Sequence, residues 1–193
     1  HIEIEPDSLL FYACKDGQLP AGKTFTISTT GGDTLYWSLS TSAQWISLSP
    51  QSGVGNSSQV TVAINTTNLS PGIHSAIIMV ASPGTDNGPV SVITNLTVDV
   101  PVSAAPEPIA PVNGDTVRVS EMEPATFSWN VVSNAANHQI QVALNPSFQP
   151  VVLDQLSAQS PISLALPKRG VAYYWRIRGM NDCGSGPWSS CAS

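Results

Sequence analysis

The sequence predicts an all-β protein made of two tandem antiparallel β-sandwich domains. Short segments in which apolar and polar residues alternate recur along the whole chain, and this period of two is the pattern of a half-buried strand. No segment shows helical periodicity over a useful length. Residues 101–111 hold four prolines, which cannot continue a central strand or a helix. We therefore expect a first domain at 1–100, a semi-rigid linker at 101–111 and a second domain at 112–193.

Seven segments of the first domain have the strand pattern, and turn-forming residues separate them. They are residues 9–12, 24–28, 35–39, 45–48, 60–64, 73–81 and 90–98. In the third segment Trp37 lies on the face expected to be buried, whereas Tyr36 points outward. Gly-Gly-Asp at 31–33 is expected to form a tight turn. Seven strands at this spacing are typical of an antiparallel sandwich.

The second domain shows the same pattern. Its expected strands are residues 125–129, 136–143, 151–153, 162–167 and 173–181, with a last strand that starts near 187. Alternation places Trp129, Tyr173 and Trp175 in the core. His138 shares an apolar face with its neighbours, so we expect a core histidine and not a metal ligand.

The outward face of the strand at 173–181 carries two arginines. Arg176 and Arg178 lie two residues apart and therefore point the same way. Trp188, on the neighbouring strand, is expected to stack between their guanidinium groups. Such a contact contributes roughly 0.5–1 kcal/mol at an exposed position. We expect the stack to be structural and not a ligand site.

The first domain resembles the BACON family, an immunoglobulin-like module of secreted and surface bacterial proteins. The resemblance rests on a W-[IL]-x-[LV]-x-P-x-S-G corner at 45–53, which contains Trp45, Pro50 and Gly53, and on the strands around it. It covers roughly residues 7–100. It implies an extracellular seven-stranded sandwich, and carbohydrate or mucin binding has been proposed for the family. It supplies no set of binding residues to place on this sequence.

The second domain resembles the fibronectin type III family over about residues 106–193. The family has a tryptophan at the end of its second strand, a G-x-x-Y entry to the sixth, a Y-x-W-R-[IV]-R-x-x-N strand and a G-x-[PS]-W-S element. Here these are Trp129 and residues 170–173, 173–181 and 186–189. In this fold Tyr173 is expected to form the tyrosine corner, in which its hydroxyl bonds to the backbone. His138 departs from the family, which usually has an aromatic residue there.

Exposed aromatic side chains are the candidates for sugar binding, because an aromatic face suits a pyranose ring. Trp37 and Trp45 are expected to pack in the core, since large aromatic residues are usually well buried. Tyr36 points away from the core and is the candidate ligand-binding residue of the first domain.

Composition and motifs argue against several functions. A net charge of −6 does not suit nucleic acid, which needs a basic face. No apolar run approaches the roughly 20 residues of a membrane span. The sequence has no catalytic motif, no calcium-binding loop and no zinc-type spacing. We therefore expect neither enzymatic activity nor a cofactor or metal.

The chain has three cysteines, and none belongs to a C-x-x-C pair. Cys183 and Cys191 flank a turn near the end of the chain and could form a disulfide, which would leave Cys14 unpaired. The alternative is that these are buried or free thiols. The cysteines therefore do not fix the redox compartment.

Together these observations favour a non-enzymatic extracellular module that acts in structure or adhesion, as a spacer, a stalk or a unit of a cell-surface fibre. The alternative, from the family resemblance, is a glycan- or mucin-binding accessory module of a secreted multidomain protein. The expected partners are other surface proteins or glycans.

End-to-end self-association is a further hypothesis. Residues 2–5 alternate like a strand but precede the strands of the first domain, and the last strand stops early at 193. An N-terminal segment of one copy that pairs with an open sheet edge of the next would produce a filament. The alternative is that residues 1–6 extend the first strand of their own domain.

Overall fold

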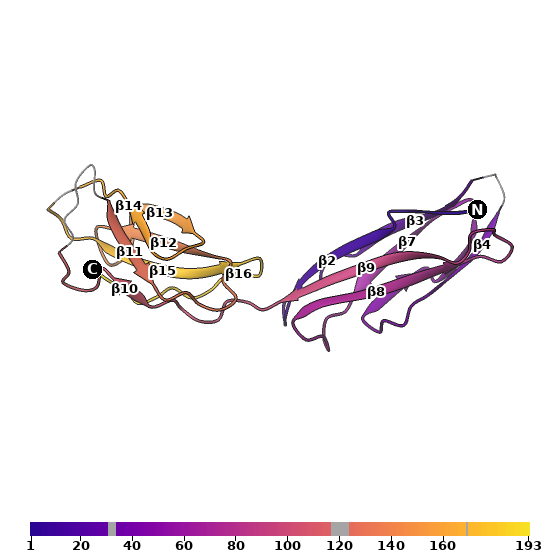
Figure 1. Ribbon diagram of the computed structural model, residues 1–193, viewed down its shortest axis with the longest axis horizontal. Coiled ribbons are helices and arrows are strands. Elements are labelled where there is room, and N and C mark those ends of the chain that lie inside the picture. Colours follow the sequence, from indigo (N-terminus) through magenta and orange to yellow (C-terminus); the bar gives the residue numbers. More distant parts are fainter. Residues whose placement is uncertain (31–33, 117–123, 169) are drawn as a thin grey trace. The chain divides into compact units, whose positions relative to one another are not determined.

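The computed structural model (Figure 1) describes residues 1–30, 34–116, 124–168 and 170–193, so the predicted turn at 31–33 lies outside it. Every regular element of the described chain is a β-strand, which confirms the predicted all-β class. The chain forms two compact units, His1–Val100 and Pro101–Ser193. No described helix is long and apolar enough to cross a membrane.

The first domain packs one sheet against another. The antiparallel four-stranded sheet contains, in spatial order, β1 (Ile2–Glu5), β3 (Lys23–Thr29), β7 (Ser57–Ile64) and β5 (Ile46–Ser49). The five-stranded sheet contains β2 (Ser8–Cys14), β9 (Val90–Asp99), β8 (Gly72–Ala81), β4 (Leu35–Ser40) and β6 (Ser52–Gly55). Within it only β2 and β9 run parallel, side by side in Figure 1, and they pair from Ser8 with Ile93 to Cys14 with Asp99.

Both sheets of the first domain contribute inward side chains to a single core. Phe25 and Val60 face it from the four-stranded sheet, and Trp37 and Leu96 face it from the five-stranded sheet. Trp37 is 3% exposed, whereas Tyr36, the next residue toward the N-terminus, is 65% exposed. Removal of these large apolar surfaces from water is the main force that holds the two sheets together.

The second domain also packs two sheets around its own core. One contains β10 (Pro108–Ala110), β11 (Ala125–Trp129) and β14 (Ile162–Leu164). The other contains β13 (Val151–Ser157), β12 (Asn137–Ala143), β15 (Tyr174–Asn181) and β16 (Gly184–Ser185). The last segment of the chain runs beside β15, where the Ser189 amide donates to the Ile177 carbonyl and Ala192 pairs with Trp175.

A strand that the sequence pattern did not indicate, β6, follows the Pro50 corner and pairs with β4. The residues of β6, Ser-Gly-Val-Gly, have a weak strand signal because glycine contributes no packing surface. Gly53 is needed here because the Trp37 indole lies directly over it, and a Cβ at this position would overlap the ring. Tertiary pairing therefore forms a strand that local preference does not favour.

The prediction of a linker over 101–111 is wrong from Pro108 onward, because Pro108–Ala110 forms β10 and pairs with β11. Proline is tolerated in β10 because this strand lies at the edge of its sheet. The linker prediction also misplaced Val102, which is buried and lies against Gly179 and Gly186. The second domain therefore begins earlier than its 112 boundary.

The N-terminal segment is part of its own domain, and the filament hypothesis that required it to be free is wrong on this point. Residues Ile2–Glu5 pair with β3, in the sheet opposite β2, so the segment does not extend the first strand either. Ile2 is 3% exposed. Asn87 donates to the Ile2 carbonyl and accepts from the Ile2 amide, both at 2.8 Å, which fixes the segment in place.

Candidate functional site

His74 and His138 have structural roles. His74 Nε2 lies 2.8 Å from the Ser70 carbonyl oxygen, and its ring meets Trp45 edge-on at 6.4 Å between centroids. His138 is 1% exposed and packs against Trp129 at 5.6 Å. Burial lowers the pKa of the His138 imidazole from its ordinary value of 6.5, because the apolar surroundings disfavour the charged form. Within the described ranges, no three His, Cys, Asp or Glu side chains form a metal-binding group.

Three tryptophans are taken up by the two cores. Trp37 covers Gly53, and its indole Nε1 donates to the Ser58 hydroxyl at 3.1 Å. Trp129 and Trp175 are 2% and 1% exposed. The Trp175 indole donates to the Pro111 carbonyl at 2.9 Å. None of these three rings presents a face to a ligand.

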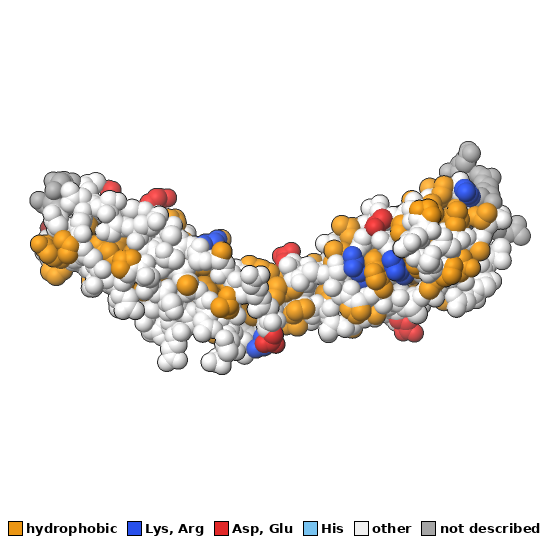
Figure 2. Space-filling view, turned by 180° about the vertical axis from the view of Figure 1, so that it is seen from behind, with side chains coloured by type: hydrophobic (Ala, Val, Ile, Leu, Met, Phe, Trp, Pro, Cys, Tyr) orange, Lys and Arg blue, Asp and Glu red, His pale blue; other side chains and the backbone are white. Residues whose placement is uncertain are grey.

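Another tryptophan, Trp188, lies between two guanidinium groups on the outward face of the second domain. Arg176 and Arg178 lie 4.3 Å and 4.4 Å from its ring centroid. Arg176 also lies 4.2 Å from the Phe148 ring. Figure 2 shows one face of the molecule, on which charged side chains are few. The stack therefore concentrates positive charge on a surface that has little of it.

Two glutamines hold these arginines in position. The side-chain oxygen Oε1 of Gln141 accepts from Arg176 Nε at 3.0 Å, and Oε1 of Gln139 accepts from Arg178 Nε at 2.8 Å. The amide nitrogens of both glutamines donate to the Asp154 carboxylate. The positive charges are thus linked through two amides to a negative one, which is an arrangement that stabilises the sheet surface.

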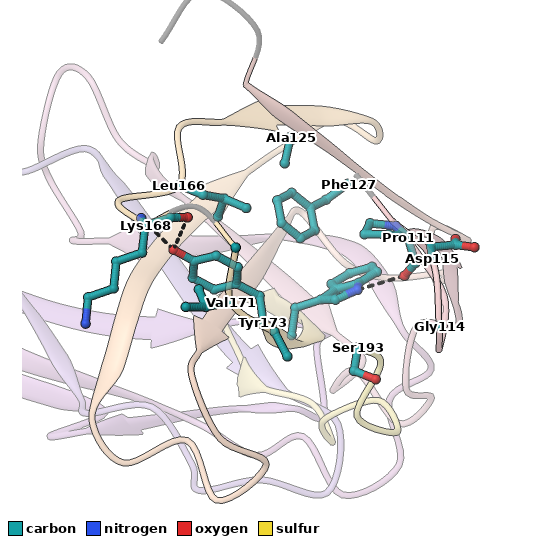
Figure 3. A pocket seen from close by; sticks show the side chains of 13 residues that line it. Pro111, Gly114, Asp115, Ala125, Phe127, Leu166, Lys168, Val171, Tyr173 and Ser193 are labelled. Carbon is teal, nitrogen blue, oxygen red and sulfur yellow. Dashed lines mark hydrogen bonds between the residues drawn. The ribbon is translucent and has the colours of Figure 1, made fainter. Parts of the chain in front are cut away.

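A cavity of about 250 Å³ opens at one end of the second domain (Figure 3). Phe127 and Leu166 lie on its wall, and Tyr173 closes one side. The Tyr173 hydroxyl accepts from the Lys168 amide at 2.8 Å and donates to the Lys168 carbonyl at 3.1 Å, so it forms the tyrosine corner. Ligand pockets usually span about 300–1,000 Å³, so this cavity is smaller than a usual ligand site.

A second cavity, of about 400 Å³, lies at one end of the first domain and is more polar. Trp45 is half-buried: part of its indole packs on the core and the rest lines the cavity. Gln44, Asn65 and Asn68 also line the cavity, and none of the described residues in its lining is charged. The side-chain oxygen Oδ1 of Asn65 accepts from the amide and the hydroxyl of Thr67, which fixes the orientation of the Asn65 carboxamide.

Sequence reasoning placed Trp45 in the core and missed these amides. Asn65 and Asn68 follow β7, and Gln44 precedes β5, its antiparallel partner in the sheet. Their meeting depends on the pairing of these strands, which no local pattern reveals. The only sequence signal was that both connections are polar. Tyr36, the candidate from the sequence, lies apart from this cavity, on β4 opposite Val54 of β6.

Neither alternative from the sequence is correct: Cys183 and Cys191 do not form a disulfide, and Cys183 is not a free thiol. Cys191 is an exposed free thiol, whereas Cys14 and Cys183 are disulfide-bonded. Partial burial raises the pKa of the Cys191 thiol. Separation along the chain was a poor guide, because a disulfide requires Cα atoms within about 7 Å and that distance is set by the fold.

Comparison with known proteins found a family model that is similar to the first domain. The family model described as the viral BACON domain matches residues 1–93. This description is viral, so the bacterial source expected from the sequence remains an expectation. A search of curated proteins found no match.

Solved structures show the same folds. Domains A168–A170 of titin are 10% identical with a TM-score of 0.56, and the alignment covers 100% of this chain and 64% of that fragment. Domains FN1–FN3 of chicken CNTN1 are 14% identical with a TM-score of 0.50, and the coverage is 95% and 61%. A Bacteroides ovatus GH5 xyloglucanase is 19% identical with a TM-score of 0.40, over 55% of this chain and 22% of the enzyme.

The likenesses to the titin and CNTN1 domains agree with the two sandwiches described above. The chain spans less than two thirds of each of these three structures. The first domain therefore has an immunoglobulin-like fold and matches the viral BACON family model over residues 1–93, and a sandwich with a fibronectin type III-like fold follows it.

Proposed function

We propose that this chain is a non-enzymatic structural module of an extracellular protein, and that its first domain bears mechanical load as part of a spacer, stalk or fibre. The observation that carries this proposal is the parallel pairing of β2 and β9. These strands lie near the two ends of the first domain, and they are paired along the whole length of β2.

Because β2 and β9 run parallel, a force that pulls on the ends of the first domain acts in shear on the hydrogen bonds between them. When the ends of the first domain are pulled apart, β2 is drawn backward and β9 forward along the same axis. The hydrogen bonds between the two strands must then break together. At one end of the pair the Ile93 amide donates to the Asp7 carbonyl, and at the other end the Lys15 amide donates to the Asp99 carbonyl. A strand pair that opens like a zipper would instead lose its bonds one at a time.

The second domain provides an internal comparison. Its first described strand, β10, pairs with β11, whereas the last segment of the chain pairs with β15 of the other sheet. Within the described residues, the Gly114 amide donates to the Ser193 carbonyl, and the amide and hydroxyl of Ser193 donate to the side-chain oxygen of Asn113 near the two ends of this domain. We expect this domain to yield at a lower force.

Single-molecule pulling on the whole chain tests the proposal. The chain is held by its two ends in reducing agent, because a disulfide at Cys14 would otherwise carry load at the end of β2. We expect a low-force and a high-force unfolding event, with the high-force event releasing up to about 36 nm of chain, at about 3.6 Å per residue for the first domain. Trp129→Ala, which removes a core side chain of the second domain, identifies the low-force event.

Two outcomes would contradict load bearing. One is a first-domain unfolding force no higher than that of the second domain. The other is a high-force event that moves with Trp129→Ala, because that event would then belong to the second domain.

An extracellular location is part of the proposal. BACON and immunoglobulin-like domains are typical of extracellular proteins, and the match over residues 1–93 supports this assignment. The disulfide bonds of Cys14 and Cys183 also favour an oxidising compartment, where such bonds form and persist.

Glycan binding is a second candidate function, and the cavity at Trp45 favours it. An exposed part of an indole suits the apolar face of a pyranose, and carboxamides both donate to and accept from sugar hydroxyls. The described residues that line the cavity are all uncharged, which favours a neutral sugar over an acidic one.

Nuclear magnetic resonance titration of the whole chain with neutral methyl glycosides tests this candidate. The chain is made in a host without N-glycosylation, since Asn65 and Asn68 each begin an Asn-x-Ser/Thr sequence. Binding at the cavity requires that Asn68→Ala weakens it and that Asn56→Ala, an exposed amide in the turn before β7, does not. Binding lost only in Tyr36→Ala would move the site to β4.

A further inference from the structure

The outward face of the five-stranded sheet in the first domain is unusually apolar for an exposed surface. Its exposed aliphatic side chains are Leu10 on β2, Ile93 on β9, Ile73 and Ile77 on β8, and Val54 on β6. They are between 48% and 78% exposed. Single exposed aliphatic residues are ordinary, whereas several on one face indicate an interaction surface.

The strand register brings most of these side chains together. Ile77 is paired with Ile93, so the two lie side by side. One step along the sheet, Leu10 is paired with Asn95, and Asn95 is paired with Ser75. The Ser75 hydroxyl donates to the side-chain oxygen Oδ1 of Asn95 at 2.7 Å. The face therefore has an aliphatic centre with an internally paired polar contact beside it.

The rest of this face carries one charge. The strands of this sheet are fully described, and their other uncharged outward positions carry serine, threonine, tyrosine, methionine, alanine, Asn95 and the disulfide-bonded Cys14 at the end of β2. The charged residue among the outward positions is Asp99, at the end of β9, where it accepts from the Tyr12 hydroxyl at 3.0 Å. A charge at the margin, already bonded, does not interrupt the surface.

The charge distribution indicates which partner this face fits. The chain has a net charge of −6, so two copies repel each other through most of their surfaces. A contact between two of these faces brings no pair of like charges together across its centre. A partner recognised by charge would instead require complementary basic or acidic groups, which this face does not offer.

The size of the face is sufficient for a stable contact. Five strands at about 4.8 Å and about seven residues at 3.3 Å give a surface of roughly 24 Å by 23 Å. A projected area of roughly 550 Å² on each copy, or about 1,100 Å² in total, exceeds the roughly 1,000 Å² of total buried surface expected of a biological interface. We infer that the first domain forms a two-fold dimer in which the outward faces of two five-stranded sheets pack against each other.

A two-fold contact suits this face because each surface can then meet its own copy. The Ile77 and Ile93 pair supplies the apolar centre, and the Asn95 amide nitrogen supplies a donor for the polar margin. Such a dimer is closed and does not propagate. This inference goes beyond the load-bearing function, which concerns bonds within one chain.

Sedimentation equilibrium of the whole chain over a range of concentrations tests the dimer. Cys191→Ser is used as the background so that the free thiol cannot cross-link two copies. The expected mass rises with concentration from 20.3 kDa toward twice that value. Ile77→Lys and Ile93→Lys place a charge at the centre of the contact, and each should weaken dimerisation by about tenfold or more.

Thr61→Lys is the matched control, because it adds the same charge to an outward position of β7 in the other sheet. It should leave dimerisation unchanged, and all three variants should keep the wild-type melting temperature. Three results overturn the inference: a monomer at every concentration, a dimer that the two isoleucine variants do not affect, and a mass that grows without limit. A monomer would leave the force measurements intact, so the two proposals fail separately.

Discussion

Single residues in the second domain show that a well-packed core can retain unsatisfied polar atoms. Both ring nitrogens of His138 and the indole nitrogen of Trp129 are buried without a hydrogen-bond partner among the described residues. Each such group costs about 1–3 kcal/mol relative to a satisfied one. The cost is tolerated because both rings still contribute apolar surface to the core. Burial also disfavours the charged form of His138, so the stability that this residue contributes depends on pH.

We expect the second domain to lose stability as the pH falls below about 6.5. Because the folded-state pKa of His138 lies below its ordinary value, the neutral ring is the form that folds. Its contribution is complete above the ordinary pKa and is lost as the pH falls toward the folded pKa, by up to about 1.4 kcal/mol per pH unit. Urea denaturation at about pH 7.5 and about pH 5.5 measures this loss.

His138→Phe is the control for the pH dependence, since it keeps an aromatic ring and removes the titrating group. This variant should be at least as stable as the wild type and should lose the dependence on pH in this range. A pH dependence that persists in His138→Phe would assign it to another group.

At the scale of secondary-structure elements, β6 depends on one glycine. The Trp37 indole occupies the space beside Gly53, so the pairing of β6 with β4 requires a residue without a side chain at this position. The glycine lowers local strand preference and at the same time permits the close packing of the tryptophan. The Pro50–Gly53 corner is therefore defined by the core and not by its own turn.

Gly53→Ala should destabilise the first domain by about 1–3 kcal/mol, because the added methyl group overlaps the Trp37 ring. Val54→Ala is the matched control, since this neighbouring side chain is 60% exposed and should change stability by less than about 0.5 kcal/mol. Chemical denaturation of the whole chain, read from the first-domain transition, measures both. Equal effects at the two positions would contradict the packing of Trp37 on Gly53.

At the scale of the whole molecule, the two domains have separate cores. No residue of the first core is shared with the second, among the residues that the structure describes. Substitutions in one core should therefore act on one unfolding transition. This independence matters for a load-bearing module, because one domain can unfold and extend while the other remains folded.

Trp129→Ala should lower the stability of the second domain by about 3–5 kcal/mol and leave the first unchanged. Phe25→Ala, which truncates a residue of the first core with 1% exposure, should have the reverse effect. Differential scanning calorimetry of the whole chain separates the two transitions. A single transition that both substitutions shift equally would show that the domains unfold as one unit.

The sequence by itself determined the fold class, most of the strands and the resemblance of the first domain to the BACON family. Alternation of apolar and polar residues is a local property, and it correctly assigned Trp37, Trp129 and Trp175 to buried faces. It also placed Arg176 and Arg178 on a common outward face.

Only the tertiary structure decided the features that depend on pairing between distant segments. β6 and β10 contain glycine or proline, so their strand signal is weak, and they form because a neighbouring strand supplies their hydrogen bonds. The residues around Trp45 and the parallel pairing of β2 with β9 are likewise set by strand order and register. A side chain's inward or outward direction follows from its nearest neighbours in sequence, but its contacts follow from which strands the fold places together.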